Sequence, residues 1–128
     1  PAPAPKLTGA MTTLFVAAGG VLGVLARWGI YRLTFHTDAL IWSTVGINIA
    51  GSFLLGLLAA ENWFGQDARE ALGVGFLGGF TTFSTFSVQV VLDVDAGEPG
   101  RALAYLVASV AGGVLAAAAG YALGRRLA

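Results

Sequence analysis

Apolar residues fill four long stretches of the chain, and short polar connections separate them. The stretches cover residues 14–33, 39–60, 71–92 and 102–123. A bilayer core about 30 Å thick is crossed by about 20 helical residues, so each stretch is long enough to span a membrane. The alternation of apolar and polar residues that is typical of barrel strands does not appear. The pattern therefore predicts an all-α integral membrane protein with four transmembrane helices.

The start of the chain differs in character from the rest. Pro and Ala alternate there, and Met11, which has the look of a native start, follows, so we interpret residues 1–10 as a flexible tail or an added segment. The connections at 36–38, 62–69 and 93–100 are too short for a second domain. We therefore expect one transmembrane domain over residues 11–128.

Composition agrees with a membrane protein and excludes several functions. The 128 residues are 56% hydrophobic and 11% charged, and seven basic residues balance seven acidic ones. Without a basic stripe, nucleic acid binding is not expected. The lack of cysteine excludes thiolate metal sites and thiol catalysis. We interpret His36, the only histidine, as a solvated residue at the membrane interface rather than a metal ligand.

Basic residues near the span ends give little orientation bias. With four spans both termini lie on one side, which carries Arg69, Arg125 and Arg126; the other side carries Arg32 and Arg101. A chain with so even a split could insert both ways up, which would permit an antiparallel homodimer. Ordinary insertion in a single orientation is the alternative.

Small residues recur at the four-residue spacing at which membrane helices pack closely. They are Gly19 with Gly23, Gly46 with Ala50, Gly75 with Gly79, and the run Ala108, Gly112, Ala116 and Gly120. Four helices packed this tightly would leave no central channel within one copy. We therefore expect any permeation path to form between copies.

The second span carries a polar face on an otherwise apolar helix. Thr44, Asn48 and Ser52 follow one another at four-residue intervals and so share one side. An asparagine in lipid is costly without a partner, which makes Asn48 a candidate functional residue, with hydrogen bonding between helices as the alternative. Tyr105 and Ser109 repeat the spacing in the fourth span, either as hydrogen-bond donors or as packing residues.

The middle of the third span is rich in glycine and hydroxyl residues, with the sequence GGFTTFSTFS at 78–87. Adjacent glycines tolerate non-helical angles and hydroxyls compete for backbone hydrogen bonds, so the segment predicts a break in the helix near its middle. The carbonyl groups freed by a break are oxygen ligands suited to a small alkali cation. A continuous helix, with glycines for close packing, is the alternative.

Phenylalanines alternate with hydroxyl residues in the same segment. Phe83 and Phe86 project from nearly the same side, among Thr82, Ser84 and Thr85. The edge of an aromatic ring is positive and a hydroxyl donates hydrogen bonds, so both attract small anions. Conduction requires several weak sites rather than one tight one, which such groups provide. Phenylalanines that simply face lipid are the alternative.

Ionisable residues are almost absent from the four spans. Arg27 is the one well inside a span, where it could snorkel to the interface or attract anions toward a pore mouth. None of the four stretches contains Asp or Glu, so a proton-coupled exporter of cations or drugs, the main rival for a chain of this size, lacks its usual machinery. A non-conducting assembly subunit, for which the glycines alone would suffice, is a second rival.

These motifs resemble the small bacterial fluoride channels known as Fluc or CrcB proteins. The likeness covers residues 12–126 and rests on 23–27, on 46–51 and above all on 78–87. It implies a dual-topology, antiparallel homodimer in the cell inner (plasma) membrane, with two pores at the subunit interface. Such a protein is not an enzyme: it passes fluoride passively out of the cytoplasm and so confers fluoride resistance.

The resemblance also implies roles for individual residues. Phenylalanines, an asparagine and a track of polar side chains line the fluoride path of the family. The matching residues here, with Thr44 from the polar face of the second span, are Thr44, Asn48, Thr82, Phe83, Ser84, Phe86, Tyr105 and Ser109. Gly78 and Thr81 match the break whose carbonyls hold a structural sodium ion at the dimer centre. Phe80 stands where an aliphatic residue is more common, which would change the packing near the break.

Overall fold

The computed structural model describes residues 8–34 and 39–128, and the described part is helical apart from short connections. Its elements are α1 (Gly9–Thr34), α2 (Ala39–Ala60), α3 (Gln66–Glu70), the π-helical segment η1 (Ala71–Leu77), α4 (Gly78–Phe80), α5 (Phe83–Asp95) and α6 (Pro99–Leu127). Of the predicted tail, Gly9 and Ala10 already belong to α1, whereas residues 1–7 lie outside the described residues, as does His36.

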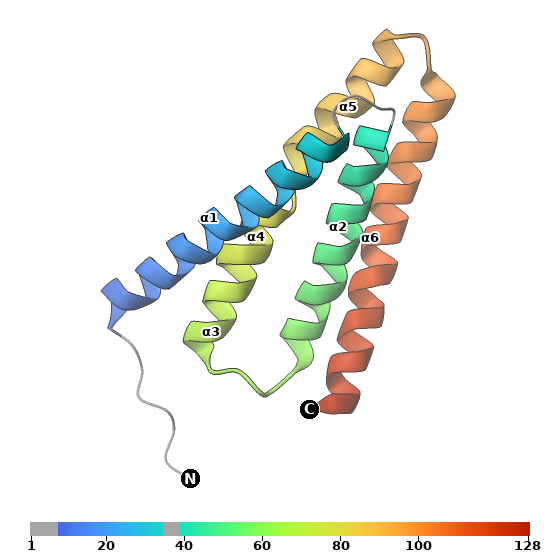
Figure 1. Ribbon diagram of the computed structural model, residues 1–128. Helices are drawn as coiled ribbons and strands as arrows, with labels where there is room; N and C mark the ends of the chain where they lie inside the picture. Colours follow the sequence, from blue (N-terminus) through green and yellow to red (C-terminus); the bar gives the residue numbers. More distant parts are fainter. Residues whose placement is uncertain (1–7, 35–38) are drawn as a thin grey trace.

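Four helical stretches are long and apolar enough to cross a membrane, which confirms the all-α prediction. They run over Gly9–Thr34, Ile41–Ala60, Gln66–Asp95 and Pro99–Leu127. Three of them extend beyond the apolar stretch that predicted them, because polar residues at their ends continue the helix. The start of α1 and the end of α6 lie toward one end of the bundle, and the turn between α5 and α6 lies at the other (Figure 1).

The third stretch changes its packing partner midway. Segments η1 and α4 pack against α1, whereas α5 packs against α6 (Figure 1). Between them Thr81 (φ −83°, ψ 157°) and Thr82 (φ −149°, ψ 121°) have extended backbone. These two residues, called the extended pair below, redirect the chain from one partner helix to the other.

Backbone contact through glycine joins α1 to the first half of the third stretch. A Cβ on Gly75 would lie 2.6 Å from the carbonyl oxygen of Val16, and one on Gly79 would lie 2.6 Å from that of Gly20. Such distances leave no room for a side chain. The predicted close packing of these glycines is confirmed.

The predicted seam on α2 is wrong for a single copy. Gly46 is exposed and meets nothing within 4 Å among the described residues, and Ala50 is exposed as well. Helix α2 instead packs closely against α6 through two glycines. Gly56 of α2 lies next to the carbonyl of Ala117, and Gly120 of α6 lies next to the carbonyl of Phe53. The four-residue spacing was present on two faces of α2, and the sequence alone did not say which face meets α6.

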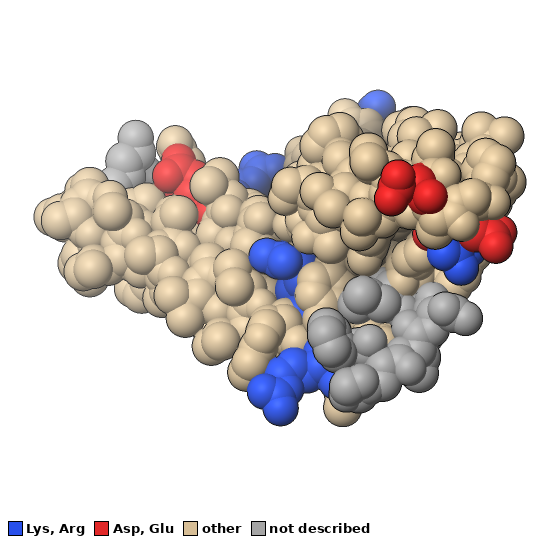
Figure 2. Space-filling model, turned by 90° about the horizontal axis from the view of Figure 1, so that it is seen from above, with Lys and Arg blue, Asp and Glu red and all other residues tan. Residues whose placement is uncertain are grey.

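The chain buries few large side chains within itself. Its core cluster consists of Val45, Phe86 and Tyr105, and most large apolar side chains on α1, α5 and α6 are exposed. Seen from the α5–α6 turn, most of the surface lacks charged side chains (Figure 2). A surface of this kind needs lipid or another subunit to cover it.

Candidate functional site

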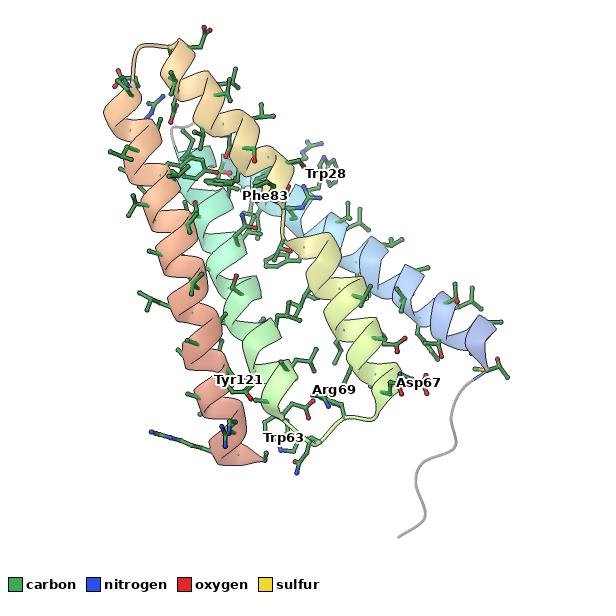
Figure 3. All side chains as sticks on the ribbon, turned by 180° about the vertical axis from the view of Figure 1, so that it is seen from behind. Trp28, Trp63, Asp67, Arg69, Phe83 and Tyr121 are labelled. Atoms are coloured by element: carbon green, nitrogen blue, oxygen red, sulfur yellow. The ribbon has the colours of Figure 1, made fainter. Side chains whose placement is uncertain are left out.

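A hollow of about 390 Å³ lies between α2, α6 and the two halves of the third stretch. Its lining includes five of the residues predicted for the anion path and both predicted cation ligands: Asn48, Thr82, Phe83, Phe86, Ser109, Gly78 and Thr81. Thr44, Ser84 and Tyr105, also predicted for the path, do not line it. Figure 3 shows Phe83 at the start of α5, between the two ends of the bundle. The structure therefore brings most of the predicted site together around the extended pair.

Asn48 binds the backbone of the extended pair. Its Nδ2 donates to the carbonyl oxygen of Thr82 at 2.9 Å, and the Thr82 N–H donates to its Oδ1 at 2.8 Å. An extended residue at membrane depth has no helical partner for these groups, so the amide of Asn48 replaces the missing hydrogen bonds. The amide retains a second N–H and a second lone pair. Asn48 can therefore bind the backbone and still face the hollow.

The hydrogen bonds around the extended pair release two carbonyl groups. In a continuous helix, the amides of Thr82 and Thr85 would bind the carbonyl oxygens of Gly78 and Thr81. Here the Thr82 amide binds Asn48, and the Thr85 amide donates to Thr82 Oγ1 at 3.3 Å. The carbonyls of Gly78 and Thr81 therefore lose their helical donors beside the hollow.

Arg27 contacts the same segment from α1. Its Nε donates to the carbonyl oxygen of Gly79 at 3.2 Å, and its guanidinium lies 5.9 Å from the centre of the Tyr31 ring. A cation near the last carbonyls of a helical segment is favourable, because the helix dipole is negative there. Arg27 thus binds the C-terminal end of the segment before the extended pair.

The two predicted phenylalanines differ sharply in exposure. Their ring centres are 5.8 Å apart, but Phe83 is 79% exposed and Phe86 only 6%. Phe86 packs edge-on against Tyr105, with ring centres 5.1 Å apart. The two adjacent rings therefore extend from the surface of one copy into its core.

Hydroxyl groups around the hollow fall into two classes. Ser109 Oγ is buried and has no hydrogen-bond partner within the part of the chain that the structure describes. Thr82 Oγ1, by contrast, donates to Thr85 Oγ1 at 3.1 Å, and Ser84 lies exposed 3.5 Å from it. Ser109 thus has a hydroxyl in the lining that could donate to an ion in the hollow.

A buried polar cluster lies beyond Phe86, next to the hollow but outside its lining. The Tyr105 hydroxyl donates to Gln89 Oε1 at 2.5 Å, and the hydroxyls of Tyr31 and Thr44 are 3.0 Å apart. Thr44 and Tyr105 are 0% exposed. The four side chains come from four different helices. Sequence reasoning missed Gln89, although it follows Phe86 by one helical turn and is polar within an apolar run.

An ion pair lies one turn further out along α5 and α6. Arg101 donates to Asp93 Oδ1 through Nη2 at 2.6 Å and Nε at 3.1 Å. The sequence placed Asp93 in a polar connection, but α5 continues to Asp95 and Asp93 is only 3% exposed. The carboxylate of Asp93 can be buried between the two helices because the guanidinium of Arg101 compensates its charge.

A second buried ion pair stabilises the opposite end of the bundle. Arg69 Nε lies 3.4 Å from Glu61 Oε1, and Arg69 Nη2 donates to the carbonyl of Leu58 at 2.7 Å. Glu61 also accepts hydrogen bonds from the backbone amides of Trp63 and Phe64. Figure 3 shows Arg69 and Trp63 together at this end. The arrangement ends α2 and fixes its connection to α3.

Side-chain metal sites are not found among residues 8–34 and 39–128. No group of three or more His, Cys, Asp or Glu side chains there could hold a metal ion.

Known proteins resemble this chain along most of its length. The family described as CrcB-like protein, Camphor Resistance (CrcB), matches residues 14–121. A Thermus thermophilus protein named fluoride-specific ion channel FluC is 43% identical over 119 residues, which are 89% of this chain and 95% of the relative. FluC 2 of Moorella thermoacetica is 41% identical over 115 residues (87% and 94%). FluC of Phenylobacterium zucineum is 43% identical over 121 residues (89% and 95%).

Proposed function

Since this chain belongs to the CrcB family, we propose that it is a passive fluoride-selective channel that lets cytoplasmic fluoride leave the cell. Relatives that match along nearly their whole length are named fluoride-specific ion channels. The four apolar helices suit a multi-pass membrane protein. We place it in the inner (plasma) membrane, where export of fluoride confers resistance.

One observation carries the proposal: the hydroxyl of Ser109, which has no partner among the described residues, and the rings of Phe83 and Phe86 line the same hollow. Fluoride is small and strongly hydrated, so a path through lipid must replace its water with donors. A buried hydroxyl and the positive edges of two rings are such groups, and each is weak enough to release the ion. Asn48 and Thr82 contribute further polar atoms to the lining.

The pores would form between two copies. Phe83 is 79% exposed in one copy although it belongs to the proposed path, so another surface must cover it. A second copy in the opposite orientation would bring two such surfaces together, and the three-to-two split of arginines between the two ends is too weak a bias to prevent either orientation. The resulting antiparallel homodimer would contain two equivalent pores.

Backbone carbonyls would bind a structural sodium ion at the dimer centre. Gly78 and Thr81 lose the helical donors of their carbonyl groups, because Asn48 and Thr82 Oγ1 take those amides. Carbonyl oxygens are hard ligands that suit a small alkali cation. A bound sodium ion would hold the extended pairs of the two copies together without taking part in permeation.

Proton-coupled export of a cation is less well supported. An exporter of that kind needs a carboxylate that exchanges protons with its substrate. The buried carboxylates of Asp93 and Glu61 each lie in an ion pair with arginine, near opposite ends of the bundle. Passive export needs no such group, since an inside-negative potential drives an anion outward by about 2.3 kcal/mol per 100 mV.

Liposomes test the proposal directly. Purified protein in vesicles loaded with potassium fluoride should release fluoride when valinomycin lets potassium leave, and vesicles loaded with potassium chloride should release little chloride. Protein-free vesicles give the background rate. Equal release of both halides, or no fluoride release by well-assembled protein, would overturn the proposed function.

A further inference from the structure

Two further residues of the hollow's lining lie close together, one on α2 and one on α6. They are Ser52, one helical turn after Asn48, and Gly113, one turn after Ser109. A Cβ on Gly113 would lie 3.6 Å from the Oγ of Ser52. Since glycine has no side chain, the space beside this hydroxyl stays open to the hollow.

The hydroxyl of Ser52 forms no hydrogen bond with its own helix. A serine or threonine inside a helix can donate to the carbonyl four residues back, as Thr13 does to Gly9 at 2.8 Å and Ser87 does to Phe83 at 2.9 Å. Ser52 Oγ makes no such bond and has no hydrogen-bond partner in the part of the chain that the structure describes. The side chain is half-buried and lines the hollow, so its proton is available to a solute there.

Ser52 lies on the side of the hollow that adjoins a second one. The second hollow has a volume of about 610 Å³ and shares Leu55 and Gly73 with the first. Leu55 follows Ser52 by one turn of α2. Arg69 also lines the second hollow, and Figure 3 shows it at the end of the bundle. Ser52 is therefore the polar side chain of α2 nearest to the boundary between the two hollows.

We propose that Ser52 is a further fluoride-binding residue of the path, one step beyond Ser109. The inference rests on the proposed function. Ser52 lies beside Gly113, and Gly113 follows Ser109 by four residues, which is about 6 Å along α6. Two hydroxyl donors at this spacing offer successive weak sites, as conduction requires. The glycine at position 113 leaves the second of these sites open to the ion.

The test moves the hydroxyl from one helix to the other. At low fluoride concentration, Ser52→Ala should slow the initial efflux of fluoride per assembled dimer about tenfold, because a hydrogen bond to an ion is lost. Adding Gly113→Ser to this variant places a hydroxyl beside the vacated position, where its Cβ has room. The double variant should recover most of the lost rate.

Two controls match these substitutions. Thr13→Val removes a hydroxyl that is exposed on α1 and does not line the hollow, so it should conduct at the wild-type rate. Ser52→Ala with Ala111→Ser adds a hydroxyl to an exposed position of α6 outside the lining. That double variant should be as slow as Ser52→Ala alone. Gel filtration gives the dimer fraction of each variant and so separates lost flux from lost assembly.

A packing role for Ser52 would not be restored by a hydroxyl on another helix. A wild-type rate per dimer in Ser52→Ala would overturn the inference. No rescue by Gly113→Ser in a well-assembled dimer, or equal rescue by Ala111→Ser, would overturn it too. If the Gly113 variant assembles poorly, the rate of Ser52→Ala per dimer, compared with Thr13→Val, decides by itself. Failure of the wild-type protein to conduct fluoride would instead refute the proposed function.

Discussion

The hydroxyl of Tyr105 donates to Oε1 of Gln89 across 2.5 Å, and this contact joins α5 to α6 just beyond the ring of Phe86. Tyr105 is fully buried, so neither water nor lipid can replace Gln89 as its partner. The two side chains are thus hydrogen-bonded to each other inside the bundle.

Removing both partners of this hydrogen bond should lower the free energy of unfolding by less than the sum of the two single removals. Tyr105→Phe removes the donor to Gln89 Oε1, and Gln89→Leu removes the oxygen to which the buried Tyr105 hydroxyl donates. Each should lower the free energy of unfolding by about 1–3 kcal/mol. The double variant should lose less than the sum, which thermal unfolding in detergent would measure. Strict additivity of the two losses would show that the side chains do not interact.

The larger features of the fold could be predicted from sequence because each depends on local composition. The apolar stretches predicted the four helices, and the motif at 78–87 led to the hollow that Phe83 and Phe86 line. Asn48 was recognised as needing a partner, but its binding to the backbone of Thr82 depends on how α2 faces the third stretch. The rotation of α2 about its axis cannot be predicted from the pattern of a single sequence.

Contacts between helices were the part that sequence could not supply. Gln89 and Asp93 looked like an isolated polar residue and a loop residue, because their partners lie on another helix. The seam at Gly46 was assigned to packing within one copy, since spacing alone cannot distinguish an inner face from an outer one. Both errors have the same cause. The helical period determines which residues share a face, but it does not determine which other helix, subunit or lipid packs against that face.

Phe83 and Phe86 should both be required for flux, but with different effects on the fold. Phe83→Ile changes an exposed side chain and should leave the stability of one copy nearly intact, whereas Phe86→Ile alters the core cluster. Each should slow fluoride efflux about tenfold or more, since the loss of about 1.4 kcal/mol of ion stabilisation corresponds to a factor of ten. The measurement is efflux per assembled dimer.

Phe15 on α1 offers a control for this comparison. It is 47% exposed and does not line the hollow, so Phe15→Ile should conduct at the wild-type rate. Undiminished flux in both the Phe83 and the Phe86 variants would remove these rings from the path.

Asn48→Leu should impair both conduction and assembly. The substitution leaves the N–H and carbonyl of Thr82 without their partner, at a cost of about 1–3 kcal/mol for each buried group. Asn62, the exposed residue just beyond Glu61, provides the control, because Asn62→Leu leaves the extended pair untouched. Flux per dimer and dimer fraction are measured together. A destabilised dimer with normal flux per dimer would assign Asn48 to packing alone.

Sodium binding should depend on the hydroxyl of Thr82. That oxygen accepts a hydrogen bond from the Thr85 amide, which in a continuous helix would donate to the carbonyl of Thr81. Thr82→Val keeps the shape of the side chain but removes this acceptor. The Thr85 amide should then donate to the carbonyl of Thr81, which makes that carbonyl a poorer ligand for sodium. In the wild-type protein, thermal unfolding should occur at a higher temperature in sodium chloride than in N-methylglucamine chloride, and Thr82→Val should reduce that difference. Thr85→Val is the matched control, because its hydroxyl only accepts from Thr82 and its backbone amide stays bound. If both valine variants respond to sodium alike, the carbonyl of Thr81 does not bind the ion. If sodium leaves the wild-type protein unaffected, neither that carbonyl nor the carbonyl of Gly78 binds it.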